Sequence, residues 1–130
     1  MITVEYGNGK KETQSALGGG LAYDMPMMVL VNQGTASASE ITAGAIQDYG
    51  RGQVVCEVTY GKGSVQDWHV LSNDQGAVRI TIAHWLTPKD RQIDGNGITP
   101  DVQVTLTDDD IKNNRDPQLD KAIALLTSAK

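Results

Sequence analysis

The order of apolar and polar residues predicts three strands in the first quarter of the chain. Residues 1–6 alternate apolar and polar side chains, which is typical of a strand with one buried face. Residues 7–11 are rich in Gly, Asn and Lys and indicate a hairpin turn, so a partner strand is expected at about residues 12–16. Residues 27–31 form a continuous apolar run, which predicts a strand buried on both faces inside an α/β sheet.

The spacing of apolar residues changes to a helical period after this run. The pattern predicts a helix over residues 37–49, and Gly50 follows it as glycine commonly follows helices. A second helix is expected to close the chain, from the capping pair Asp116-Pro117 to about Ser128. The apolar positions are Ala38, Ile41, Ala45 and Ile46 in the first helix and Leu119, Ala122, Ile123 and Leu126 in the second.

Four further stretches have strand character, and Gly, Asn-Asp and Pro residues separate them. The whole pattern predicts an α/β fold with a mixed, β-rich sheet and few helices. Residues 108–110 are three aspartates without the glycine and distal glutamate of a calcium loop, so we expect a solvated acidic turn there. The strand-like stretches are residues 53–58, 65–71, 78–83 and, less regularly, 102–106.

The chain has 130 residues and a net charge of -5, which fits one folding unit that buries its own core. Its 11 Lys and Arg residues are scattered, and no basic stripe is interleaved with aromatic residues, so a nucleic-acid partner is not expected. No apolar run approaches the roughly 20 residues that span a bilayer. The single cysteine, Cys56, lies in a strand-like stretch and is expected to be a small buried side chain.

Neither a nucleotide nor a metal ion is expected to bind. The Gly-Lys pair at residues 61–62 does not match a phosphate-binding loop, because Gly63 follows the lysine and Cys56 stands where an earlier glycine is needed. His69 and His84 lie on separate predicted strands without a nearby cysteine pair, which is poor spacing for metal ligands. We therefore expect no cofactor and no metal site.

Ser37, with Glu40 three residues later, matches a capping box at the start of the predicted helix. That role explains Ser37 without catalysis, but the same position also presents a hydroxyl at a positive helix N-terminus, which suits a nucleophile. Lys62 is the candidate base, since lysine replaces histidine in Ser-Lys variants of the catalytic triad. A lysine in water is protonated at neutral pH, so a base role requires burial; the alternative is a turn lysine in solvent.

Seven short motifs follow one another in the middle of the chain: VLVN at 29–32, GTASASEI at 34–41, AGA at 43–45, QD at 47–48, TYGKG at 59–63, VQ at 65–66 and GITPDV at 97–102. Together they resemble the carboxyl-terminal processing proteases, also called tail-specific proteases. The resemblance covers about 75 to 80 residues, with the motifs in the order and spacing of that family.

The resemblance implies roles for five residues. The nucleophile of the family is the first serine of the Ser-Ala-Ser-Glu segment, and its lysine partner follows 25 residues later, which implies a catalytic dyad of Ser37 and Lys62. A glutamine four residues after the lysine orients it in several members, and Gln66 matches that position. The amide of Ala38 is the implied oxyanion donor. Asp48 corresponds to an acidic residue that is important in some members, and a structural role on the helix face is favoured for it.

The resemblance also implies the Clp-protease/crotonase-like fold, with residues 1–130 forming part of a catalytic domain. Family members carry a peptide-binding PDZ domain and a second oxyanion-donating turn before the matching region; neither is expected in this chain, nor is a signal peptide. The implied function is that of a serine endopeptidase cutting proteins near apolar C-terminal tails, with weak or no activity expected from residues 1–130 alone. The family suggests an extracytoplasmic or periplasmic location, with the full-length protein associated with a membrane.

Two alternatives belong to other functional classes. The chain can act as a non-catalytic module that binds peptides or associates with itself through exposed sheet edges, forming a homo-oligomer. The plan of strand, turn and helix is also similar to that of crotonase-like enzymes, which bind acyl-coenzyme A. Their chemistry does not need Ser37 and Lys62 at this spacing.

Overall fold

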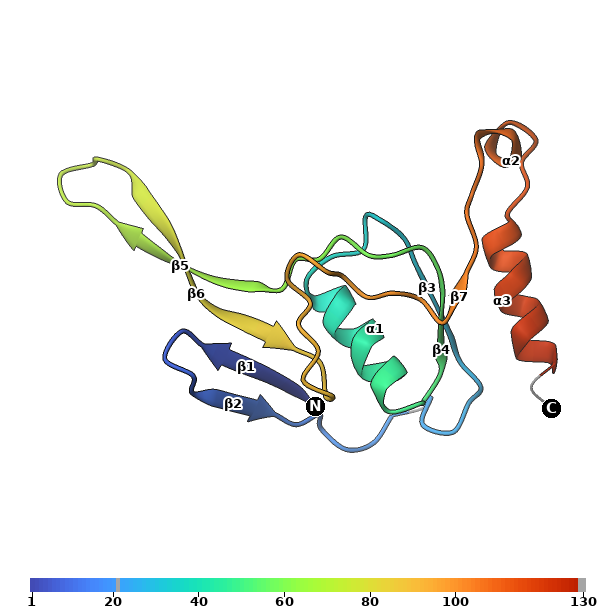
Figure 1. Cartoon of the computed structure of the whole chain (residues 1–130), viewed down its shortest axis with the longest axis horizontal. Coiled ribbons are helices and arrows are strands. Elements are labelled where there is room, and N and C mark those ends of the chain that lie inside the picture. Colours follow the sequence, from blue (N-terminus) through green and yellow to red (C-terminus); the bar gives the residue numbers. More distant parts are fainter. Residues whose placement is uncertain (21, 129–130) are drawn as a thin grey trace.

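The computed structural model of the chain describes residues 1–20 and 22–128, in which seven strands form two sheets (Figure 1). The larger sheet is antiparallel and contains β1 (Ile2–Tyr6), β2 (Lys11–Gln14), β5 (Ser64–Val70) and β6 (Ala77–Leu86), in the order β2-β1-β6-β5. The smaller sheet is parallel and contains β3 (Met28–Val31), β4 (Gln53–Cys56) and β7 (Val102–Gln103), in the order β3-β4-β7.

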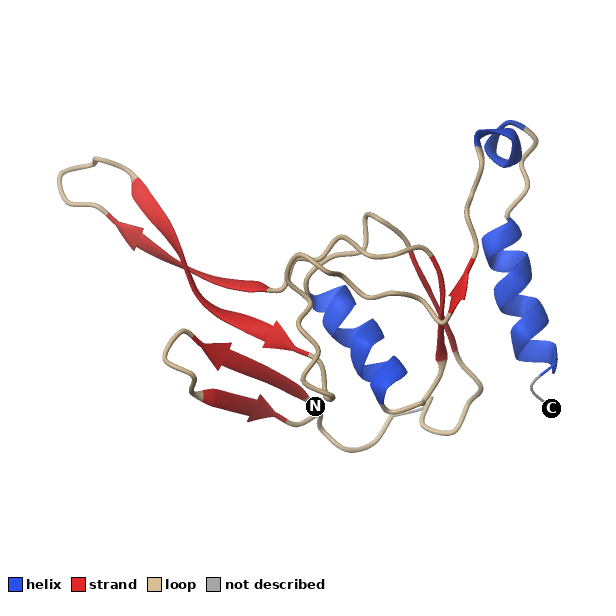
Figure 2. Ribbon diagram, viewed as in Figure 1, coloured by secondary structure: helices blue, strands red, loops and turns tan. Residues whose placement is uncertain are grey.

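Three helices in the described part of the chain accompany the sheets: α1 (Ala38–Asp48), α2 (Asp108–Lys112) and α3 (Pro117–Ser128). Figure 2 shows α1 between the two sheets and α3 beyond the parallel sheet. Both helices contact β4, and α3 also contacts β3. The predicted fold class, α/β with β-rich content and few helices, is confirmed. No helix among the described residues has the length and apolar character needed to cross a membrane.

The hydrophobic core lies between α1 and the parallel sheet. Val29 pairs with Val54 in the β3–β4 register, and Leu30 pairs with Val55. Side chains alternate along a strand, so Val54 faces α1 whereas the equally buried Val55 faces the other side of the sheet. Burial of each such side chain contributes about 1.5–3 kcal/mol. The core cluster consists of Val31, Ala43, Val54, Ile93 and Ile98, with Val29, Ile41 and Trp85 packed against it.

The expectation that residues 27–31 are buried on both faces is wrong. The strand formed there, β3, is an edge strand of the parallel sheet, and β4 takes the central place. Leu30 remains 44% exposed, while Val31 is buried against α1. A continuous apolar run cannot by itself distinguish a central strand from an edge strand, because burial depends on what packs alongside.

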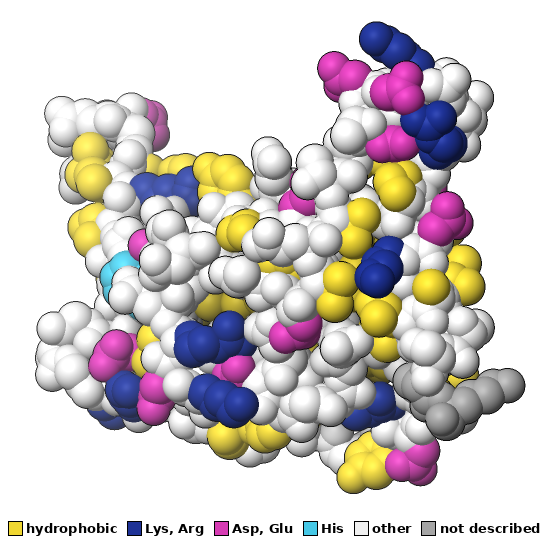
Figure 3. Space-filling view, turned by 45° about the vertical axis from the view of Figure 1, so that its right-hand side comes forward, with side chains coloured by type: hydrophobic (Ala, Val, Ile, Leu, Met, Phe, Trp, Pro, Cys, Tyr) yellow, Lys and Arg dark blue, Asp and Glu magenta, His cyan; other side chains and the backbone are white. Residues whose placement is uncertain are grey.

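The second half of the chain differs from the expected elements at several ends. The strand β4 stops at Cys56, β6 extends to Leu86, and β7 has only two residues. The aspartates at residues 108–110 begin the short helix α2 instead of forming a turn, because Thr107 caps the helix and Arg115 pairs with Asp109 and Asp110. Figure 3 shows side chains of both charges gathered at this end of the molecule.

Several local predictions are confirmed. The strands β1 and β2 form the expected hairpin, with Ile2 opposite Gln14. The predicted N-cap of α3 is present, since a side-chain oxygen of Asp116 accepts a hydrogen bond from the Leu119 amide at 2.9 Å. Cys56 is buried as expected, and this burial raises the pKa of its thiol.

The parallel pairing of β3 and β4 positions the loops that carry the candidate residues. Val31 pairs with Cys56, so both strands end at the same edge of the sheet. The loop that follows β3 leads to Ser37, and the segment that follows β4 leads to Lys62. Two segments that are 25 residues apart in sequence therefore emerge side by side, and the Tyr60 amide donates to the Thr35 carbonyl oxygen at 2.9 Å.

The first testable prediction concerns the packing of the loop at Gly97. A Cβ atom at Gly97 would lie 2.4 Å from the Thr59 carbonyl oxygen, and Gly97 has a φ of 68°. We expect Gly97→Ala to lower the free energy of unfolding by about 2–4 kcal/mol, measured by urea denaturation. The matched control is Gly9→Ala, which has a φ of 80° but open space around it and should cost only about 1 kcal/mol. Equal losses in the two variants would contradict the steric explanation.

Candidate active site

Ser37 lies at the junction between the β3 loop and α1, as its N-cap residue. Its backbone has a φ of 57° and a ψ of -121°, a conformation that residues other than glycine rarely adopt and that costs about 1–3 kcal/mol. The Ser37 carbonyl oxygen accepts from the Ile41 amide at 3.0 Å, so the helix begins directly after this strained residue. A strained serine between a strand and a helix is a feature shared by known serine nucleophiles.

The structure records no hydrogen bond from the Glu40 amide to the Ser37 hydroxyl that meets the usual distance and angle limits. The hydroxyl lies toward the Glu40 amide in the arrangement of the predicted capping box, while the other half of the box is formed by the Ser37 amide, which donates to Glu40 Oε2 at 2.8 Å. The next amide, that of Ala38, has no acceptor among the described residues and stands at the positive end of α1. A hydroxyl and a free amide thus lie at the same helix terminus.

The Glu40 side chain joins the two candidate segments. It is fully buried and accepts four hydrogen bonds. Oε2 accepts from the amides of Ser37 and Lys62, each at 2.8 Å. Oε1 accepts from the Thr59 hydroxyl at 2.5 Å and from the Gly61 amide at 2.6 Å. One carboxylate therefore fixes the backbone at Ser37 relative to the backbone at Lys62.

The segment around Lys62 is also held from its other side. The Gly63 amide donates to Asp94 Oδ1 at 3.1 Å, and the Gly63 carbonyl oxygen accepts from the Trp85 amide at 2.7 Å. A Cβ atom at Gly63 would lie 2.3 Å from the Asp94 nitrogen, so only glycine permits this approach. Glycine is required here for close packing.

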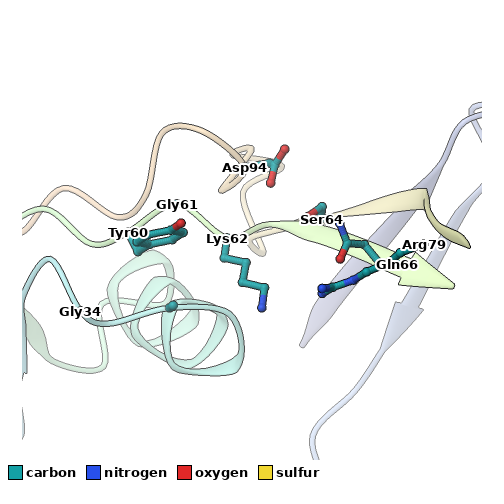
Figure 4. A pocket seen from close by; sticks show the side chains of 9 residues that line it. Gly34, Tyr60, Gly61, Lys62, Ser64, Gln66, Arg79 and Asp94 are labelled. Atoms are coloured by element: carbon teal, nitrogen blue, oxygen red, sulfur yellow. The ribbon is translucent and has the colours of Figure 1, made fainter. Parts of the chain in front are cut away.

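A cavity of about 580 Å³ lies beside Lys62. In Figure 4 the Lys62 side chain extends into it from the segment after β4, and the side chains of Gln66 and Arg79 extend from the β5–β6 hairpin. The Asp94 carboxylate points away from the lysine amine. The lining residues are Gly34, Ala36, Tyr60, Gly61, Lys62, Ser64, Gln66, Arg79 and Asp94.

The structure brings some of the predicted site residues together. Lys62 and Gln66 line one cavity together with Ala36, whereas Ser37, the next residue in the chain, is half-buried and is not among the lining residues. The structure records no hydrogen bond between the Ser37 hydroxyl and the Lys62 amine, and Lys62 is exposed. The backbones of the two residues are held together by Glu40, and their side chains are not joined. The catalytic dyad stays a prediction.

Asp48 lies at the opposite end of α1, about 16 Å along the helix axis from Ser37 at 1.5 Å per residue. Its side chain is only 3% exposed and pairs with Arg91 at 2.5 Å, and it accepts from the Lys89 amide at 2.8 Å. Burial is the largest influence on the pKa of Asp48 and would raise it. Hydrogen bonds from Thr87, Lys89 and Arg91 together outweigh burial and lower the pKa. Asp48 links α1 to the loop after β6 and does not line the cavity.

The two histidines lie apart from each other. His69 is exposed and lies 3.3 Å from Asp67, and His84 Nδ1 lies 3.6 Å from Asp94 Oδ2. Within residues 1–20 and 22–128, no three His, Cys, Asp or Glu side chains gather closely enough to hold a metal ion.

Sequence patterns did not identify three contributors to this site. Glu40 was recognised only as part of a capping box, and its bonds to Thr59, Gly61 and Lys62 cross 19 to 22 residues. Arg79 and Asp94 reach the cavity from β6 and the loop after it. The one available signal was Glu40 itself. A carboxylate at a helix N-terminus can accept hydrogen bonds from amides of a neighbouring segment as well as from amides of its own helix.

Comparison with known proteins gives consistent matches. The model of peptidase family S41 matches residues 1–104. A carboxyl-terminal-processing protease of Synechocystis sp. is 42% identical over 130 residues, covering 96% of this chain and 30% of that protein. Carboxyl-terminal-processing peptidase 3 of Arabidopsis thaliana, a chloroplast protein, is 51% identical over 80 residues, which is 62% of this chain and 15% of that protein. The chain thus spans less than a third of the length of these relatives.

Solved structures match in the same way. The photosystem II D1 C-terminal processing protease has a TM-score of 0.74 and 40% identity, over 79% of this chain and 26% of that one. The tricorn protease matches with a TM-score of 0.61 and 20% identity, over 79% of this chain and 10% of that one, which shows a shared fold alone. These matches confirm the predicted Clp-protease/crotonase-like fold.

Replacing Glu40 tests its role as the link between the two segments. In Glu40→Gln one of the two side-chain oxygens becomes a donor, so at least one buried amide loses its acceptor. We expect the free energy of unfolding to fall by about 2 kcal/mol or more in chemical denaturation. The control is Glu57→Gln, a partly exposed glutamate for which no side-chain hydrogen bond is recorded, and it should be near neutral. A loss no larger than that of the control would refute the link.

The lowered pKa of Asp48 makes its contribution dependent on pH. A depressed carboxyl pKa adds stability that is present above the ordinary value of 3.8 and is lost as the pH falls through the lowered folded-state value. We expect Asp48→Asn to be less stable than the parent chain by about 1–3 kcal/mol at pH 7. This difference should shrink steadily below pH 3.8. Urea denaturation across that range measures it, with the exposed Asp24→Asn as control; a difference that does not change with pH would contradict the assignment.

Proposed function

The chain belongs to peptidase family S41, and from that membership we propose that it carries the Ser37–Lys62 catalytic dyad of a serine endopeptidase. The observation that supports the dyad most strongly is the Glu40 carboxylate, which binds the backbone amides of both residues. An arrangement that holds two amides on one carboxylate gives the two backbones, from which the side chains extend, a constant relative position. Catalysis by a nucleophile and a base requires such positioning.

The proposed reaction begins when neutral Lys62 removes the proton of the Ser37 hydroxyl. The Ser37 oxygen then forms a bond with the scissile carbonyl carbon, and the resulting oxyanion accepts a hydrogen bond from the Ala38 amide. The peptide C–N bond breaks as Lys62 returns its proton to the leaving amine. Water, activated by Lys62 in turn, hydrolyses the acyl-enzyme ester and regenerates Ser37.

Lys62 needs a less aqueous environment for this role than the free chain provides. The Lys62 side chain is exposed in the cavity, whereas a general base must be neutral to accept a proton. A bound peptide that fills the cavity would exclude water and favour the neutral amine. Gln66 lines the same cavity, and we assign it the role of orienting the amine once the side chain is enclosed.

The substrate class follows from the relatives. They are named carboxyl-terminal processing proteases, so we propose protein substrates that are cut near apolar C-terminal tails. The described residues offer Ala38 as one oxyanion donor, and loss of a second donor typically costs about 100- to 1000-fold in rate. We therefore propose weak or no turnover by the 130-residue chain alone. Self-association through sheet edges is the alternative role for the chain by itself.

The dyad is tested in a chimera in which this chain replaces the matching region of the Synechocystis relative, which is 42% identical. We expect Ser37→Ala and Lys62→Ala each to lower kcat/KM for a fluorogenic tail peptide by at least about 1000-fold. The control is Ser39→Ala, an exposed serine one helical position beyond Ala38, which should keep nearly full activity. Substantial turnover by the Ser37 or the Lys62 variant would disprove the dyad.

The alternatives have distinct readouts in the same set of experiments. A chimera without peptidase activity, together with a chain that forms dimers in size-exclusion chromatography, would favour the non-catalytic module. Binding of coenzyme A in calorimetry would favour the crotonase-like alternative. Robust turnover by the 130-residue chain alone would show that one oxyanion donor is enough.

A further inference from the structure

Arg79 lines the cavity and has no acidic partner among the described residues. It lies on β6, directly opposite Trp68 of β5. The structure records no ion pair for Arg79 within residues 1–20 and 22–128, whereas Arg91 pairs with one aspartate and Arg115 with two. Its guanidinium therefore keeps its charge-assisted hydrogen-bonding capacity for a ligand.

Trp68 holds the Arg79 side chain in place. The guanidinium carbon lies 5.6 Å from the centroid of the Trp68 ring, within the range of a cation–π contact. A guanidinium that lies over a ring still has N–H groups in its own plane that can bind a carboxylate through two parallel hydrogen bonds. The contact restricts the flexible side chain before a ligand arrives, which reduces the entropy lost on binding.

The cavity is positive at this end although the chain is acidic overall. Lys62 and Arg79 both extend into it, with the neutral Gln66 on the same hairpin. The one carboxylate of the lining, Asp94, points away from the lysine amine and accepts from the Gly63 amide. Because the net charge of the chain is -5, this positive end stands out as a place for a negative group.

We propose that Arg79 binds a carboxylate of the peptide that occupies the cavity, and so contributes to substrate selection. The guanidinium of Arg79, stacked on Trp68 and free of acidic partners, is the anchor. The carboxylate is either an Asp or Glu side chain of the peptide or its free C-terminus. This assignment rests on the proposed peptidase function in one respect: the bound peptide is taken to be a substrate.

The position of Arg79 places the carboxylate a few residues from the bond to be cut. Trp68, the partner of Arg79 in register, lies four residues beyond Ser64, which is about 13 Å along β5 at about 3.3 Å per residue. Figure 4 shows the Arg79 side chain directed back along the hairpin toward Lys62. An extended peptide lying beside β5 covers this distance with a few residues.

The test uses the 130-residue chain carrying Ser37→Ala, so that binding is measured without cleavage. Four fluorescent octapeptides of the same apolar sequence are compared. Two carry one glutamate and two carry glutamine at that position. In each pair, one peptide has a free C-terminus and the other an amidated C-terminus. We expect the peptide without any carboxylate to bind about ten-fold more weakly than the best carboxylate peptide in fluorescence anisotropy. The arm that retains tight binding identifies the source of the carboxylate.

Arg79→Gln should abolish this preference, and Arg79→Lys should keep part of it, because lysine retains the charge without the planar fork. The matched control is Lys121→Gln, which removes one positive charge from the exposed face of α3 and should keep the full preference. A preference that persists in Arg79→Gln, or that is absent from the parent chain, would overturn the proposal.

The outcome is separable from that of the peptidase proposal. Cleavage that depends on Ser37 and Lys62, combined with binding that ignores carboxylates, would overturn only the role of Arg79. Carboxylate binding that depends on Arg79, combined with a chimera whose cleavage does not depend on Ser37 and Lys62, would support this inference and refute the proposed dyad.

Discussion

The buried carboxylate of Glu40 is the interaction on which the geometry of the site depends. It has no cationic partner among the described residues, so four hydrogen-bond donors offset the cost of removing it from water. Two of those donors are the amides of Ser37 and Lys62. Because a carboxylate without these donors would be unstable in the interior, the position of each segment constrains the other. The strained backbone of Ser37 can persist because of this constraint.

Parallel strand pairing and glycine bring the two segments close enough for that carboxylate to bridge them. The strands β3 and β4 end at one edge of the sheet, and the Thr59 hydroxyl extends the network by accepting from the Ile98 amide at 2.7 Å. Gly63 and Gly97 pass within contact distance of neighbouring backbone, where any side chain would collide. Hydrogen bonds to the buried Glu40 side chain hold the backbone of the site, whereas Lys62 and Arg79 extend into an open cavity. This division is consistent with the proposal that a peptide substrate completes the site.

Local patterns predicted those elements whose signals are themselves local. The helix α1, the β1–β2 hairpin and the capped α3 follow from periodicity, turn composition and an N-cap, all of which act within a few residues. The errors arose where neighbours decide the outcome. Burial of β3 depends on its place at the sheet edge, and the aspartates before Lys112 became helical because Thr107 and Arg115 stabilise that turn.

The sequence by itself determined the order of the elements, the 25-residue spacing of Ser37 and Lys62 and the series of motifs that resembles the processing proteases. Only the tertiary structure decided that Glu40 binds both segments, that Asp48 pairs with Arg91, and that Arg79 shares a cavity with Lys62. The physical reason is the sequence separation over which each kind of interaction acts. Periodicity and capping report interactions between near neighbours in the chain, whereas hydrogen bonds to a buried carboxylate and the lining of a cavity join residues that only packing brings together.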